Sequence, residues 1–148
     1  MRKAITCCIA AFLSMTLLLG TAFASGGAAE RIDYADGSYA IITTVTGGIT
    51  RGTVDDHKSY TYYDSDGNRC FAYTLFATFN YDGRSSEVED IDYQADVYQR
   101  GWDISSHSEW TSGDTAYGRA VFTDPDGGRH SVSLSLTCDE DATVPRTE

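Results

Sequence analysis

The sequence predicts an all-β domain, an antiparallel β-sandwich of about seven to eight short strands. Three observations support this fold class. Apolar and polar residues alternate by two along most of the chain after its first 24 residues, as in half-buried strands. Thr, Val, Ile, Tyr and Phe dominate these segments, and clusters of Gly, Asp, Asn and Ser separate them. Helical spacing of apolar residues is absent there, and a partly open β-barrel is the alternative arrangement of the same strands.

The first 24 residues have the three parts of a secretory signal peptide. Arg2 and Lys3 precede an apolar run at residues 4–19, and Ala22 and Ala24 form a small-x-small cleavage site. The apolar run is short for a membrane span, which needs about 20 residues. We therefore expect cleavage after Ala24, secretion to the extracellular space and a mature chain of about 124 residues with no membrane span.

The chain is strongly acidic. Its formal net charge is −11 at pH 7, and removal of Arg2 and Lys3 with the signal peptide makes it −13. A chain of this charge repels nucleic acid, so no nucleic-acid partner is expected. The mature length suits a single domain, which we expect to be a monomer. We assign 25–37 to a flexible N-terminal lead-in, 38–138 to the β-sandwich domain and 139–148 to an acidic disordered tail.

Gly47 and Gly48 mark the first predicted hairpin. Residues 41–46 and 49–54 alternate on either side of this pair. Both glycines can adopt the positive φ that a two-residue primed turn requires. We therefore predict a tight turn at Gly47-Gly48.

The longest predicted strand, residues 70–81, forms the centre of the fold. It follows a strand at 60–63 and a turn at 64–68, whose Asp, Gly and Asn residues suit a hairpin. One face of the long strand is apolar throughout and is predicted to be core. Its members are Phe71, Tyr73, Leu75, Ala77, Phe79 and Tyr81.

Four further strands complete the predicted domain. One ends near Val97, and the segment 102–110 has a polar middle that suits an edge strand. Residues 115–123 form the next strand. After a turn at 124–128, apolar side chains alternate with hydroxyls from 131 to 138, as in a strand with one buried face.

Two cysteines, Cys70 and Cys138, remain after signal cleavage in an oxidising compartment. Cys138 alternates in phase with the apolar residues of the last strand, so it should face the core, whereas Cys70 alternates with Phe71. We predict a Cys70–Cys138 disulfide, which would stabilise the fold by about 4 kcal/mol through the long loop that it closes.

Three acidic groups resemble parts of calcium sites. Residues 64–68 and 124–127 each place carboxylates two positions apart before a glycine, and residues 87–92 hold four carboxylates. Neither turn is followed by the remaining ligands of an EF-hand loop, and hairpin turns need the same Asp, Asn and Gly residues. We therefore predict ordinary turns, with no bound metal or other cofactor.

The sequence carries no recognisable catalytic motif. His57, His107 and His130 show no metal-ligand spacing, and neither G-x-S-x-G nor H-E-x-x-H occurs. We therefore do not expect an enzyme. The alternative is a small glycan-active hydrolase that uses a pair of surface carboxylates.

Ten tyrosines and two tryptophans exceed what one small core needs. The candidate ligand-stacking residues are Tyr60, Tyr62, Trp102 and Trp110, with Tyr63 and Tyr98 as further exposed rings. Flat rings on a sandwich face can stack on sugars, although tyrosine is also a strong strand former. We predict an extracellular binding or interaction module whose partner is a protein or a glycan.

Several short motifs recur together between Tyr62 and Cys138. They are Tyr63-Asp64-Ser65-Asp66-Gly67-Asn68, Tyr73-Thr74-Leu75, Ala77-Thr78-Phe79, Tyr81-Asp82-Gly83, Trp102 with Ile104, Ser112-Gly113-Asp114-Thr115-Ala116 and Leu136-Thr137-Cys138-Asp139. This set resembles an uncharacterised family of small secreted β-rich proteins of Gram-positive, Firmicute-type gut bacteria. The resemblance implies a secreted β domain and no particular activity. In that family a second cysteine follows the Tyr-x-Gly turn, where this chain has Val88.

Overall fold

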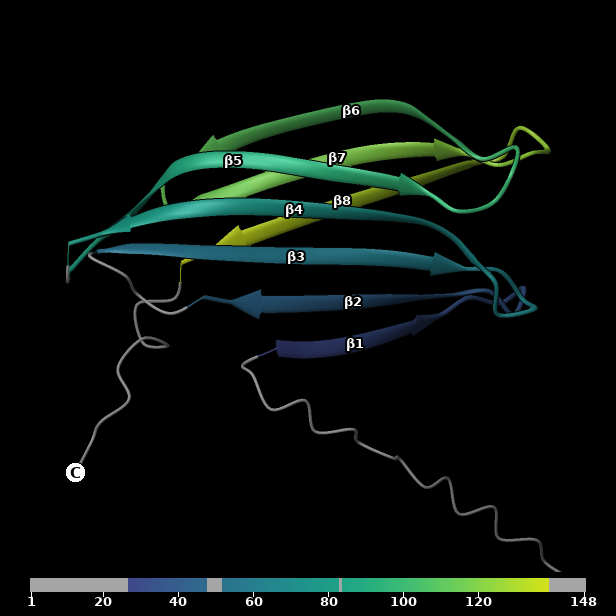
Figure 1. Cartoon of the computed structure of the whole chain (residues 1–148), viewed down its shortest axis with the longest axis horizontal. Helices are drawn as coiled ribbons and strands as arrows, with labels where there is room; N and C mark the ends of the chain where they lie inside the picture. Colours follow the sequence, from purple (N-terminus) through teal and green to yellow (C-terminus); the bar gives the residue numbers. More distant parts are fainter. Residues whose placement is uncertain (1–26, 48–51, 83, 139–148) are drawn as a thin grey trace, which may run out of the picture.

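The computed structural model describes residues 27–47, 52–82 and 84–138, and it confirms the all-β sandwich. Antiparallel strands form two packed sheets, with the orders β1-β2-β3-β4-β5 and β6-β7-β8 (Figure 1). The strands are β1 (Gly27–Asp33), β2 (Tyr39–Thr46), β3 (Thr53–Tyr63), β4 (Arg69–Tyr81), β5 (Ser86–Val97), β6 (Asp103–Ser112), β7 (Thr115–Thr123) and β8 (Arg129–Thr137). The predicted signal peptide and the predicted tail at 139–148 lie outside the described residues.

The domain begins earlier than predicted. Residues 27–33, expected to belong to a flexible lead-in, form β1, an edge strand of the large sheet. Every residue of β1 pairs with β2, ending with Asp33 opposite Tyr39. The sequence signal for this strand is weak because Ile32 is its only strong strand former, and an exposed edge strand needs little apolar alternation.

The predicted two-residue turn at Gly47-Gly48 is wrong. The β2–β3 register pairs Thr46 with Asp56, so the connection between these strands is longer. The Gly47 N–H donates both to the Asp55 carbonyl and to Asp56 Oδ1, each over 3.0 Å. These two hydrogen bonds hold Asp56 opposite Thr46 at the end of β2. A two-residue turn would have placed Ile49 there.

Three five-residue hairpin turns, 34–38, 64–68 and 124–128, lie at one end of the sandwich, which we call the turn end (right in Figure 1). In each, the first N–H donates to the fifth carbonyl over 2.9–3.0 Å, and the fourth residue is a glycine with a φ of 81–87°. Glycine adopts this φ without steric cost, which explains the Asp-Gly steps. The structure thus confirms the predicted turns at 64–68 and 124–128 and adds the turn at 34–38.

The predicted core strand is confirmed as the centre of the fold. The inner face of β4 is buried over Phe71, Tyr73, Leu75, Ala77 and Phe79. The side chains that cover it from β7 and β8 are Ala116, Ala120, Phe122, Val132, Leu134 and Leu136. The rings of Phe71 and Phe122 stack with their centroids 4.0 Å apart, which brings the two sheets into direct contact.

The two sheets are in close contact where the Tyr73 hydroxyl of β4 meets Gly118 of β7. Tyr73 is fully buried, and its hydroxyl group lies 3.1 Å from Nε2 of His107 on β6. Burial is the main reason that the pKa of Tyr73 is raised to about 12, so the phenol stays neutral and keeps its hydrogen bond. A methyl group at position 118 would overlap the Tyr73 hydroxyl, so glycine is required there.

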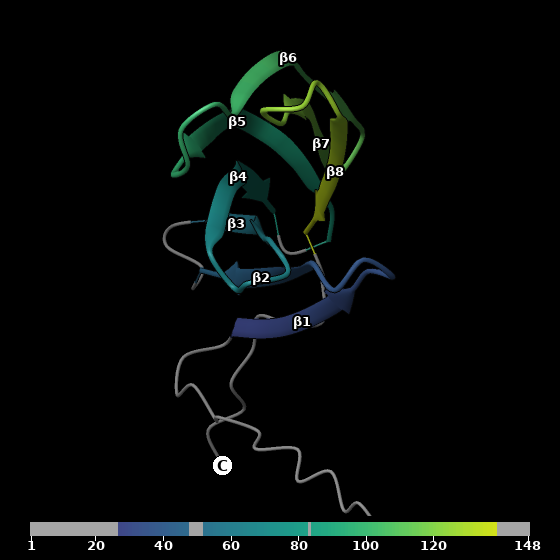
Figure 2. The same ribbon diagram turned by 90° about the vertical axis from the view of Figure 1, so that its right-hand side faces the viewer.

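The small sheet covers only part of the large one. In the described residues, β6, β7 and β8 contact β3, β4 and β5 but make no contact with β1 or β2. Figure 2 shows β1 and β2 at the end of the large sheet that is away from the small sheet. The inner faces of these two strands therefore extend past β8, which is a free edge of the small sheet.

The predicted Cys70–Cys138 disulfide is not formed, although both residues are buried. Cys70 lies near the start of β4 at the turn end, whereas Cys138 follows β8 at the opposite end, where its N–H reaches the Asp114 carbonyl. The length of β8, about 30 Å at a strand's rise per residue, separates these ends. A disulfide needs Cα atoms within about 7 Å. Alternation correctly predicts that Cys138 faces the core but contains no information about its position along the sandwich.

The approach of Tyr73 to Gly118 leads to a stability prediction. Gly118→Ala should lower the free energy of unfolding by about 1–3 kcal/mol, because the new methyl group meets both the Tyr73 hydroxyl and Leu75 Cδ1. Urea denaturation measures this loss. Tyr73→Phe removes the oxygen that the methyl group meets, so the double variant should lose less stability than the two single variants combined. Additive losses would contradict this account of the sheet contact.

Candidate functional site

A hollow of about 270 Å³ opens at the turn end, between the large sheet and the free edge of the small sheet. Three segments distant in sequence build it: the β1–β2 turn, the last part of β3 and the start of β8. The lining residues are Tyr34, Asp36, Ser38, Tyr60, Tyr62, His130 and Ser131. We call this hollow the turn-end pocket. It combines aromatic rings with hydroxyl, carboxylate and imidazole groups in a small volume.

Strand geometry explains how the aromatic side of the pocket arises. Tyr60 and Tyr62 are two residues apart on β3, so both point to the inner face of the large sheet. Tyr62 is buried against Phe71, with a ring-centroid distance of 5.3 Å, whereas Tyr60 is only half-buried. Tyr34 stands beyond them in the turn, and its hydroxyl shares a 2.8 Å hydrogen bond with the hydroxyl of Tyr60. With 39% of its surface exposed, Tyr34 forms the outer rim.

Asp36 is the carboxylate of the pocket. Its Oδ1 accepts hydrogen bonds from the Ser38 hydroxyl over 2.6 Å and from the Ser38 N–H over 3.0 Å. These two hydrogen bonds lower the pKa of Asp36 below its ordinary value, so the group is ionised at neutral pH. An ionised carboxylate accepts hydrogen bonds and donates none. Asp36 can therefore bind hydroxyl or amide donors of a ligand.

His130 forms the wall that β8 contributes. Its Nε2 lies 3.0 Å from Oδ2 of Asp124, in the β7–β8 turn. The imidazole ring is surrounded by Tyr62 and Trp102, with centroid distances of 5.1 and 4.7 Å. Contacts on several sides thus fix the orientation of this ring before any ligand arrives.

The structure brings together three of the four predicted ligand-stacking residues. Tyr60 and Tyr62 line the turn-end pocket, and Trp102 packs directly behind it against Tyr62. Trp110 is elsewhere: it lies on the outer face of the small sheet and stacks on Tyr117, with centroids 5.3 Å apart. Alternation identifies the face of a strand, but it does not show which faces of the two sheets meet.

The two further predicted aromatic residues also lie away from the pocket. Tyr63 stacks on Tyr39 with centroids 4.7 Å apart, and the guanidinium of Arg69 lies 3.7 Å from the centroid of Tyr98. The contribution of the 34–38 turn and of His130 to the pocket was not predicted from the sequence. The Asp-Gly step at 36–37 could have predicted this turn, because the turns at 64–68 and 124–128 contain the same step.

In the two turns that resemble parts of calcium loops, the first Asp accepts hydrogen bonds from the backbone of its own turn. Oδ1 of Asp64 accepts the N–H groups of Asp66 and Asn68, at 3.0 and 2.8 Å. Oδ1 of Asp124 accepts the corresponding two N–H groups of its own turn, at 2.9 and 2.7 Å. Among the described residues, no group of three or more His, Cys, Asp and Glu side chains is arranged to hold a metal ion. Asp64 and Asp124 thus stabilise their own turns by accepting backbone hydrogen bonds.

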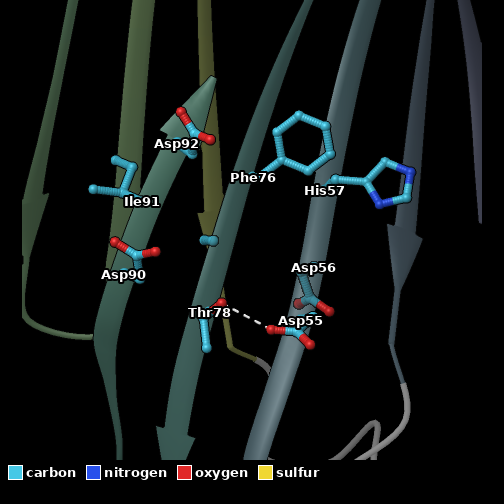
Figure 3. Close-up of a pocket in the computed structure, with 9 residues that line it drawn as sticks. Asp55, Asp56, His57, Phe76, Thr78, Asp90, Ile91 and Asp92 are labelled. Atoms are coloured by element: carbon cyan, nitrogen blue, oxygen red, sulfur yellow. Dashed lines mark hydrogen bonds between the residues drawn. The ribbon is translucent and has the colours of Figure 1, made fainter. Parts of the chain in front are cut away.

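A second hollow of about 200 Å³ lies on the outer face of the large sheet (Figure 3). Asp55 of β3 and Asp90 of β5 flank Thr78 of β4, whose hydroxyl donates to Asp55 Oδ1 over 2.8 Å. In the adjacent row, His57 and Asp92 flank Phe76, which is 37% exposed. Asp90 and Asp92, two of the four carboxylates that the sequence places at residues 87–92, therefore lie on this shallow surface.

Comparison of the chain with family models, curated proteins and solved structures finds no match. The resemblance to a family of small secreted proteins therefore stays a prediction. The part of the chain that the structure describes contains no helix long and apolar enough to cross a membrane.

The hydrogen bonds of Asp124 lead to a pH prediction. Hydrogen bonds from His130 and then from the Gly128 N–H lower the pKa of Asp124. Such a group stabilises the fold above its unfolded pKa, and this contribution is lost as the pH falls through the lower folded pKa. Thermal melts between pH 5 and pH 2 should therefore show a smaller loss of Tm for Asp124→Asn than for the wild type.

The matched control for this measurement is Asp126→Asn. The Asp126 carboxylate lies in the same turn but makes no hydrogen bond within the described residues. Its substitution should leave the pH dependence of Tm unchanged. An Asp124→Asn variant with the wild-type pH dependence would show that this carboxylate does not stabilise the turn.

Proposed function

We propose that this protein is a secreted carbohydrate-binding module and that the turn-end pocket holds its sugar. The observation that carries the proposal is the composition of the pocket, which is lined by three tyrosines, the Asp36 carboxylate and Ser38. A sugar ring has apolar C–H faces and a rim of hydroxyl groups. Aromatic rings suit the faces, while acceptors such as Asp36 suit the hydroxyls.

The size of the pocket supports a small ligand. Sites for drug-sized molecules are typically about 300–1,000 Å³, and this pocket, at about 270 Å³, is just below that range. It suits a single sugar ring at the end or in a branch of a glycan. The partly exposed Tyr34 at the rim would contact the next sugar of the glycan.

Binding is a better proposal than hydrolysis. Glycoside hydrolysis uses two carboxyl groups, one of which must carry a proton. The turn-end pocket contains one carboxylate, Asp36, and its hydrogen bonds favour the ionised form. On the outer face, Asp55 and Asp90 are two strand spacings apart, about 10 Å between backbones, on an open surface. The hydrolase alternative therefore has weaker support.

We also propose that the protein acts outside the cell, because residues 1–24 have the order of a signal peptide. Expression of the whole chain in a bacterium with a general secretion pathway should release a protein that begins at Ser25, as measured by intact mass. Ala24→Asp should reduce cleavage, because the site needs a small residue. Release of the protein with Met1 still attached would contradict the proposal.

Substitutions in the pocket test the binding proposal. The wild type is first screened on a glycan array and against insoluble polysaccharides, and the variants are then measured on a retained glycan. Tyr34→Ala should weaken binding about tenfold, equivalent to about 1.4 kcal/mol, because it removes the exposed stacking ring. Trp110→Ala is the control, since this ring is also exposed but lies on the outer face of the small sheet.

Two outcomes would contradict this proposal. One is that no glycan is retained by the wild type. The other is that Trp110→Ala abolishes retention while Tyr34→Ala leaves it unchanged, which would place the sugar on the outer face of the small sheet.

A further inference from the structure

The free edge of β8 differs from the other sheet edges. β1 and β5 carry charged side chains along their lengths, and β6 has a bulge between Ile104 and Ser106. Charges and bulges are common devices that prevent a sheet edge from pairing with another strand. β8 has neither between Ser131 and Thr137: its register with β7 is regular, and its residues there are Ser, Thr, Val and Leu. No strand in the described part of the chain pairs with this edge, which leaves it open to strand addition.

The space beside this edge has a floor of apolar residues with a few charged side chains. A strand added to β8 would lie over β2, because β8 is above β3 and β4 and the strands of a sheet are about 4.8 Å apart. The inner face of the two uncovered strands offers Ile32 and the exposed carboxylate of Glu30 on β1, and Ala40, Ile42 and Thr44 on β2. Ile32 and Ile42 are only half-buried. An added strand would complete their burial and contribute favourable free energy.

Lys58 gives this floor its positive charge, and the same inner face also carries the carboxylates of Glu30 on β1 and of the buried Asp56 on β3. It is the only lysine among the described residues, and it lies on the inner face of β3, opposite Thr44 on one side and Leu75 on the other. Lys58 is half-buried and makes no hydrogen bond or ion pair within the described part of the chain. A carboxylate from an added strand would provide the missing partner.

We propose that the β8 edge binds an extended segment of a partner protein, which becomes a fourth strand of the small sheet. Backbone hydrogen bonds to β8 would hold the segment, and its side chains would alternate between two environments. One set would face the inner surface of β2 and would be apolar, with Asp or Glu at the position over Lys58. The other set would face solvent beside the serines of β8. Of the residues that line the turn-end pocket, only Ser131 belongs to this edge, and the binding of a segment along β8 does not depend on carbohydrate binding.

The asymmetry of the sandwich favours a separate segment over a second copy of the chain. An antiparallel β8–β8 pair would join two small sheets around a twofold axis. Because β1 and β2 extend beyond β8, each copy would then drive these strands into the space occupied by β3 and β4 of the other. A single extended segment fits the two-strand overhang without this clash.

A peptide library tests the proposal directly. Phage-displayed nine-residue segments are selected on the mature protein, with all nine positions varied among apolar, polar and charged residues. Selected peptides should share an apolar alternation of period two with one Asp or Glu near the centre. In 15N–1H spectra, such a peptide should shift the amides of residues 131–137 more than those of the outer face of the large sheet.

Charge reversal provides the specific control. Lys58→Glu should weaken binding of the selected peptide at least tenfold, and exchanging the peptide's carboxylate for lysine should restore binding to this variant. Arg119→Glu is the matched reversal on the exposed outer face of β7 and should have no effect. Equal binding by wild type and Lys58→Glu, selected peptides without alternation, or amide shifts away from β8 would overturn the proposal. Self-association of the protein through β8 would also overturn it, in favour of a second copy.

Discussion

The contact between Tyr73 and Gly118 is the constraint on which the rest of the structure depends. A tyrosine on the inner face of β4 needs both space and a hydrogen-bond partner, and β7 and β6 supply these as Gly118 and His107. The absence of a side chain at position 118 lets the sheets approach until Phe71 and Phe122 stack. The small sheet is thereby placed over β3, β4 and β5, and the remaining two strands of the large sheet are left uncovered.

The position of the candidate site follows from this placement. Because β8 lies above β3 and β4, its first residues meet the inner-face tyrosines at the end of β3. The β1–β2 turn then closes the third side with Tyr34, Asp36 and Ser38. Side-chain hydrogen bonds also hold this end together; for example, Nε2 of Gln99, in the β5–β6 connection, donates to Oδ2 of Asp64 in the 64–68 turn over 2.9 Å. The pocket is thus built on strands and tight turns, which favours a preorganised site.

Much of the fold follows from local sequence patterns, because side-chain alternation and turn chemistry act over a few residues. The face of β4, the limits of β7 at 115–123 and the turns at 64–68 and 124–128 are all predicted in this way. The errors concern pairing over longer distances. The register at Thr46 depends on Asp56, ten residues away, and β1 is held mainly by its pairing with β2.

The same contrast between local patterns and long-range packing applies to the candidate site. Tyr60, Tyr62 and Trp102 are identified by residue type, but their common location depends on how two sheets pack. The cysteines are the clearest example of the limit. Cys70 and Cys138 are both core residues, yet they lie at opposite ends because β4 and β8 run in the same direction (Figure 1). Burial and number of cysteines alone could not reveal this separation.

The central claim is that ligand recognition takes place at the turn end, where the packing of unequal sheets leaves a pocket. Amide chemical shifts of the 15N-labelled mature protein, titrated with a glycan that it retains, test this claim most directly. The account predicts that the largest shifts fall on Tyr34, Ser38, Tyr60 and Ser131, which line the pocket. The largest shifts at Trp110 and Tyr117, with the pocket amides unchanged, would contradict it.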